Sequence, residues 1–133
     1  EVVKVHGTST PVGDGIELFS TIDALGETGY HIAAPKSQFG HMLGAAGSVE
    51  FIACLLMLKN QKTTPCLNAN WLAETLEPVQ EMEDWQGTQK TVSEFRHLLP
   101  TAAVATPIHQ LVSLNYGFGG TNSGIILSRH GSN

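Results

Sequence analysis

Two histidines in this chain stand in sequence contexts that can present an imidazole in a pocket. His6 ends an apolar run and is followed by the turn sequence Gly-Thr-Ser-Thr-Pro-Val-Gly. His41 stands five residues after Lys36, within a second glycine-rich segment. An imidazole held at such a turn can donate its ring N–H to negative charge that develops in a reaction. The alternative interpretation is that His6 is a core histidine and His41 a first-turn helix residue.

The residues before and after His6 predict a strand, a turn and a helix. Val2, Val3 and Val5 are typical of a buried strand, which places His6 at its carboxyl end. Asp14 and Glu17 have the spacing of a capping box, so a helix is predicted over 15–25, ending at the glycine at position 26.

The region around His41 predicts a strand over 30–34 and a helix over 40–59. Apolar residues leave this helix almost no polar face, so it is predicted to be buried on most sides. Residues 111–116 and 123–128 are predicted to form two strands, joined by Gly117-Phe118-Gly119-Gly120 in a hairpin with a backbone that glycine permits. The order strand, helix, strand, helix, strand, strand predicts an α/β domain with helices layered on a mixed sheet.

The segment 68–110 carries weaker signals. A short helix is predicted over 71–79, and a Thr/Ala-rich loop over 101–107. The rest is expected to be an irregular insertion, and residues 129–133 a frayed tail.

Composition excludes several classes of function. The 133 residues carry a net charge of −5 and no Lys/Arg cluster, which argues against nucleic-acid binding. Cys54 and Cys66 lack metal-ligand spacing, so neither a zinc site nor a disulfide framework is expected, and a reducing, cytoplasmic setting fits best. We expect no membrane span and no signal peptide.

Three segments in this order, VHGTSTPVGDG, KSQFGHMLGAAG and NYGFGGTN, resemble the C-terminal half of a β-ketoacyl synthase, a thiolase-like condensing enzyme. The resemblance extends over the chain except for 68–110, which matches nothing in the family. It implies decarboxylative Claisen condensation of malonyl and acyl thioesters that acyl carrier protein delivers on its phosphopantetheine arm, in fatty acid or polyketide synthesis. No bound cofactor is implied.

The resemblance also assigns roles to individual residues. His6 and His41 match the two histidines of a Cys-His-His triad, which hydrogen-bond the malonyl thioester oxygen. Lys36 matches the active-site lysine, and Glu50 the glutamate that pairs with it. Glu17 is either a neighbouring support of the site or only a capping-box residue.

Further matches concern the tunnel that admits the substrate. Thr8 and Thr10 match the threonines that bind phosphopantetheine, whereas Phe118 and Gly119 match the gate and oxyanion hole. Tyr116 replaces the more usual phenylalanine, a departure that leaves the preferred acyl chain open.

The nucleophilic cysteine of the family lies in an N-terminal half that this sequence lacks, and both cysteines here are predicted to be structural. We therefore expect the chain to be the C-terminal portion of a longer synthase, inactive by itself and dimeric in the complete enzyme. One alternative is a non-catalytic partner of the chain-length-factor type or an inactive truncated relative. Another is a free-standing module that binds only a pantetheine arm.

Overall fold

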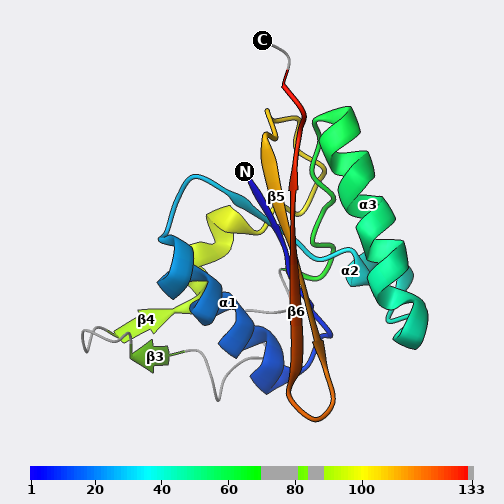
Figure 1. Cartoon of the computed structure of the whole chain (residues 1–133). Coiled ribbons are helices and arrows are strands. Elements are labelled where there is room, and N and C mark those ends of the chain that lie inside the picture. Colours follow the sequence, from blue (N-terminus) through cyan, green and yellow to red (C-terminus); the bar gives the residue numbers. More distant parts are fainter. Residues whose placement is uncertain (70–80, 84–88, 132–133) are drawn as a thin grey trace.

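The computed structural model describes residues 1–69, 81–83 and 89–131. Four strands form a mixed sheet in the order β2-β1-β5-β6: β1 (Val2–Lys4), β2 (His31–Ala33), β5 (Gln110–Gly117) and β6 (Thr121–Ser128) (Figure 1). Strand β1 is parallel to both β2 and β5, and β6 is antiparallel to β5. Parallel neighbouring strands need a crossover connection, whereas antiparallel ones can be joined by a tight turn. This mixed sheet with its C-terminal hairpin confirms the predicted α/β architecture.

Helices cover the sheet on both faces. Figure 1 shows α1 (Pro11–Leu25) and α3 (Ala46–Asn60) on opposite sides of it. Alternation along the first strand explains the two layers, since successive side chains point to opposite faces. Val3 and Val5 join the apolar cluster under α1, whereas Val2 joins the cluster under α3.

Helix α1 begins earlier than predicted, and its capping box is absent. Thr10 is the N-cap residue, and Pro11 occupies the first turn, where a missing N–H costs nothing. Asp14 lies inside this helix, and its carboxylate accepts hydrogen bonds from the backbone N–H groups of Ser9 and Thr10. The helix ends at Gly26 as predicted, with a φ of 84°.

The helix predicted over 40–59 begins later, at Ala46, and runs to Asn60 as α3. A short helix α2 (Lys36–Phe39) ends at Gly40, whose φ is 77°, and a 3-10 turn, η1 (Leu43–Ala45), precedes α3. The prediction that this segment is buried on most sides was wrong. Only one face of α3 packs on the sheet, through Ala46, Glu50, Cys54, Met57 and Leu58, whereas Ile52, Leu55 and Leu56 are each about half exposed.

By length and composition alone, the 18-residue stretch Leu43–Asn60 is apolar enough to cross a membrane, with a mean hydropathy of 1.3. A core helix of a globular domain meets the same criterion. The expectation that the chain has no membrane span therefore stays a prediction.

The segment between α3 and β5 contributes to the core. It holds a two-stranded sheet, β3 (Glu81–Glu83) and β4 (Gln89–Thr91), and the 3-10 helix η3 (Val92–Leu98). Phe95 and Leu98 of η3 are each 1% exposed. The Phe95 ring packs edge-on against the Phe19 ring of α1, with the two ring centroids 6.0 Å apart. The sequence did not predict these elements, and the helix predicted over 71–79 lies outside the described residues.

Candidate active site

The turn after β1 fixes the backbone at His6. Gly7 has a φ of 49°, a left-handed conformation that glycine adopts without strain. The Glu17 carboxylate of α1 accepts the backbone N–H of His6 at 2.6 Å and that of Gly7 at 2.8 Å. Burial raises the pKa of Glu17, and these two hydrogen bonds oppose that rise. Of the two roles predicted for Glu17, the structure favours support of the His6 turn over a capping box.

Gly7→Ala is expected to destabilise the fold by roughly 1–2 kcal/mol, the cost of a left-handed backbone for an L-residue. A Cβ there would also lie 3.3 Å from Val5 Cγ2 and 3.4 Å from Ala34 Cβ. Chemical denaturation measures the loss. Gly44→Ala is the control, because a Cβ there meets nothing within 4 Å and its φ is not positive. Equal unfolding free energies for both variants would contradict the prediction.

Lys36 lies between His6 and Glu50, as the first residue of α2. Its Nζ donates to the His6 carbonyl oxygen at 2.6 Å and lies 2.5 Å from Glu50 Oε1 and 3.5 Å from His6 Nδ1. The pairing of Lys36 with Glu50 that the family resemblance implied is present. Glu50 is fully buried on the inner face of α3, so it requires such a cation.

His6 and His41 meet edge-on, with ring centroids 5.7 Å apart. Burial, followed by the charge of Lys36, lowers the pKa of His6, which favours the neutral imidazole. An ammonium only donates, so Lys36 assigns the Nδ1 of His6 as an acceptor. The backbone N–H of Leu43 donates to His41 Nδ1 at 3.1 Å. In the neutral form, both rings therefore carry their proton on Nε2.

Sequence reasoning missed Lys4, which is fully buried in the middle of this network. Its Nζ forms an ion pair with Glu50 Oε2 and donates to the Leu114 carbonyl oxygen at 2.6 Å and Asn115 Oδ1 at 3.0 Å. Burial lowers the pKa of Lys4, and Glu50 opposes that shift. The available signal was a lysine between Val3 and Val5, on the strand face that also carries His6.

The residues predicted to line the substrate tunnel lie around the pair without all joining it. Thr8 and Thr10 flank the turn, with their hydroxyl oxygens 3.5 Å apart. Phe118 is fully exposed at the tip of the β5–β6 hairpin, so the structure does not bring it to the two histidines. Gly119 follows it with a φ of 80°. On the same hairpin, the centroid of the Tyr116 ring lies 5.6 Å from that of the His6 ring.

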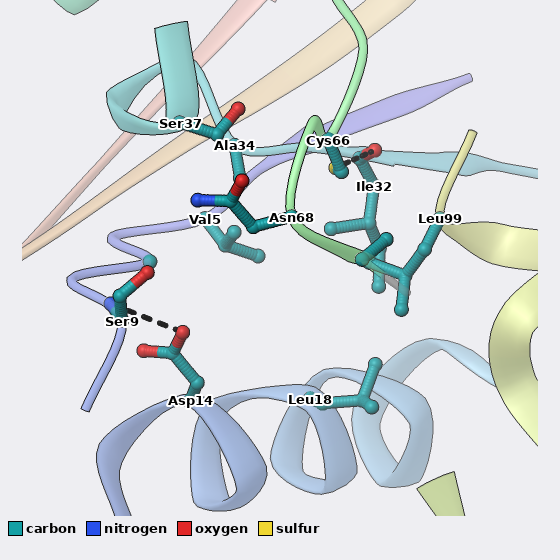
Figure 2. A pocket seen from close by; sticks show the side chains of 12 residues that line it. Val5, Ser9, Asp14, Leu18, Ile32, Ala34, Ser37, Cys66, Asn68 and Leu99 are labelled. Carbon is teal, nitrogen blue, oxygen red and sulfur yellow. Dashed lines mark hydrogen bonds between the residues drawn. The ribbon is translucent and has the colours of Figure 1, made fainter. Parts of the chain in front are cut away.

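Neither cysteine is placed as a nucleophile. Burial raises the pKa of Cys54 and that of Cys66 to about 11 each, so both remain thiols at neutral pH. Cys66 donates to the Ile32 carbonyl oxygen at 3.3 Å (Figure 2). Among residues 1–69, 81–83 and 89–131, no group of three or more His, Cys, Asp or Glu side chains is placed to hold a metal ion.

A cavity of about 60 Å³ lies on the α1 side of the sheet. Figure 2 shows apolar side chains of Val5, Leu18, Ile32 and Leu99 around it, with polar groups that include Ser9 and Asp14. Neither His6 nor His41 is among the residues that line this cavity. The cavity is therefore separate from the histidine pair.

Comparison with known proteins identifies the family of this chain. Residues 1–70 match the family model of the β-ketoacyl synthase C-terminal domain. The 3-oxoacyl-[acyl-carrier-protein] synthase 1 of Haemophilus influenzae is 36% identical over an alignment of 133 positions, which covers 98% of this chain and 28% of that protein. Synthase 2 of Vibrio harveyi is 34% identical, over 96% of this chain and 27% of its own length.

Solved structures extend the likeness to the fold. A β-ketoacyl synthase from Burkholderia phymatum superimposes with a TM-score of 0.71 at 28% identity, over 97% of this chain and 27% of that one. The ishigamide ketosynthase/chain length factor gives a TM-score of 0.74 at 24% identity, over 98% of this chain and 28% of its own, and shows the thiolase-like fold alone. The chain thus spans little more than a quarter of these relatives. It belongs to the β-ketoacyl synthase family and corresponds to a C-terminal portion of its members.

Proposed function

We propose that this chain is the C-terminal catalytic portion of a 3-oxoacyl-[acyl carrier protein] synthase, an acyltransferase that performs decarboxylative condensation. The observation that carries the proposal is the His6–His41 pair, with ring centroids 5.7 Å apart and both Nδ1 atoms engaged as acceptors. Two Nε2–H donors that remain free of these contacts can bind one substrate oxygen. They supply the hydrogen bonds that an enolate oxygen requires.

In the proposed reaction, the C–C bond to the malonyl carboxylate breaks, carbon dioxide leaves, and the electron pair moves onto the thioester oxygen. His6 and His41 stabilise this negative charge. The enolate carbon then attacks the carbonyl of an acyl group held on a cysteine, forming the new C–C bond and releasing the thiolate. Lys36 holds His6 in the tautomer that donates from Nε2.

The acylated cysteine is assigned to the part of the synthase that precedes this chain. Cys54 and Cys66 are buried thiols, and this chain spans about 28% of the Haemophilus relative. The exposed apolar residues Ile52, Leu55 and Leu56 of α3 supply a surface that the remaining part would cover.

Acyl carrier protein is the proposed partner and delivers both thioesters. Thr8 and Thr10, in the turn that follows His6, would bind the phosphopantetheine arm through their hydroxyls. One solved relative is described as a type II polyketide ketosynthase in complex with its acyl-carrier protein. We further propose a cytoplasmic enzyme that is dimeric when complete.

Intact-mass measurement tests the proposal on two proteins. The isolated 133-residue chain, incubated with an acyl carrier protein thioester, is expected to gain no acyl mass, since both thiols are buried. The full-length protein that carries this sequence is expected to be acylated and to release carbon dioxide from malonyl carrier protein. An acyl adduct on the isolated chain, or a full-length protein that neither accepts acyl groups nor decarboxylates malonyl thioester, would contradict it.

A second candidate is a non-catalytic partner of the chain-length-factor type, because a solved relative with this fold is described by that term. The presence of Lys36 between His6 and Glu50 favours the catalytic reading. A natural full-length sequence that has another residue in place of the upstream cysteine would favour the non-catalytic partner instead.

A further inference from the structure

Lys4 is a buried cation to which the proposed reaction assigns no role. Its side chain is fully buried, and its Nζ has three partners: Glu50, the Leu114 carbonyl oxygen and Asn115 Oδ1. Burying an ammonium is costly even when it is paired, and an apolar residue would pack this position at lower cost. Valines occupy the two preceding positions of the strand. Packing alone therefore does not account for a lysine here.

Lys4 and Lys36 divide one carboxylate between them. Lys4 pairs with Oε2 of Glu50 and Lys36 with Oε1. The terminal torsion of a glutamate is soft, so a cation on one oxygen also determines where the other oxygen points. On the far side, Lys36 contacts the His6 carbonyl oxygen and Nδ1. A continuous line of polar contacts thus runs from β5 through Lys4, Glu50 and Lys36 to His6.

The charged and titratable groups around His6 come from every element packed against it: Lys4 on β1, Glu17 on α1, Lys36 on α2, His41 before η1, Glu50 on α3 and Tyr116 on β5. After burial, the charges of Lys36 and Lys4 lower the pKa of His6, and that of Glu50 raises it. Removing the Lys4 charge would leave Glu50 facing one cation instead of two. The pKa of His6 would then rise.

We propose that Lys4 is a positioning residue of this site, which fixes Glu50 from the β5 side and directs Lys36 onto His6. The proposal rests on the proposed function, since it gives Lys4 a part in the same reaction. Lys4 acts through Glu50 and Lys36. A purely structural Lys4, tying β1 to β5, would affect stability and leave the titration of His6 unchanged.

Four variants of the full-length synthase separate these roles. Lys4→Gln and Lys4→Met both remove the charge. Lys4→Gln keeps a hydrogen-bond donor and Lys4→Met keeps an apolar stem, and the test needs only one of the two variants to fold. Lys4→Arg keeps the charge. Lys59→Gln, at an exposed lysine in the last turn of α3, is the control.

The first measurement is the NMR titration of the His6 ring in histidine-labelled protein, assigned by its loss in His6→Ala. The midpoint is expected to move to higher pH in Lys4→Gln and Lys4→Met and to stay in place in Lys4→Arg and Lys59→Gln. The second measurement is the pH profile of malonyl decarboxylation. Its acid limb should move in the same direction, because a proton on His6 Nδ1 would repel the Lys36 ammonium, and the ring would lose that contact.

An unmoved His6 midpoint in the folded charge-removing variants, or the same displacement in Lys4→Arg, would overturn the proposal. The titration requires no turnover, so it also separates the two hypotheses. A wild-type protein that decarboxylates nothing would contradict the proposed function, while a shifted His6 midpoint would still show that Lys4 controls the charge on His6.

Discussion

Each of the variants His6→Ala and His41→Ala is expected to lower malonyl decarboxylation by the full-length synthase about 100- to 1000-fold, the usual cost of losing one oxyanion donor. Each substitution removes one of the two Nε2–H groups that the contacts at Nδ1 leave free. Acylation of the upstream cysteine should continue, because the enolate forms only in the second half of the reaction. Release of carbon dioxide and intact mass measure the two steps separately.

His109→Ala is the matched control, because His109 is exposed and lies before β5, away from the pair. It should retain both steps. Unimpaired condensation in His6→Ala or in His41→Ala would remove the catalytic assignment. Loss of cysteine acylation in both variants would instead mean that the pair acts in the first step.

Glu50→Leu is expected to destabilise the folded protein by about 3–5 kcal/mol, the cost of removing one partner from a buried ion pair. Glu50 is fully buried and is the carboxylate that Lys4 and Lys36 both contact. Its loss leaves two buried ammonium groups whose remaining hydrogen bonds are to neutral oxygen and nitrogen atoms. Urea denaturation, monitored by circular dichroism, measures the change in the free energy of unfolding.

Asp23→Leu is the comparison for this prediction, since it removes an exposed carboxylate from α1 by the same chemical change. Its effect should stay within about 0.5 kcal/mol. If Glu50→Leu unfolds at the same urea concentration as the wild type, the buried network contributes nothing to stability.

The sequence determined those features that depend on neighbours along the chain. Gly26 ended α1, the Gly117–Gly120 run formed the hairpin, and the valines before His6 formed a strand that leaves the imidazole at its end. Each rests on a local backbone preference or on the two-residue period of a strand. The family resemblance added the pairing of Lys36 with Glu50, which the structure contains.

Tertiary structure alone decided which side chains are covered and with what. Lys4 finds its partners 46, 110 and 111 residues away. The pairing of β1 with β5 places Leu114 and Asn115 beside it, and α3 supplies Glu50. The apolar pattern of α3 likewise indicated side chains that favour burial, but not that only one face of the helix meets the sheet. The hydrophobic effect is non-directional, so a sequence pattern indicates which side chains can be buried. The packing of elements that are distant in the sequence determines which of them are buried.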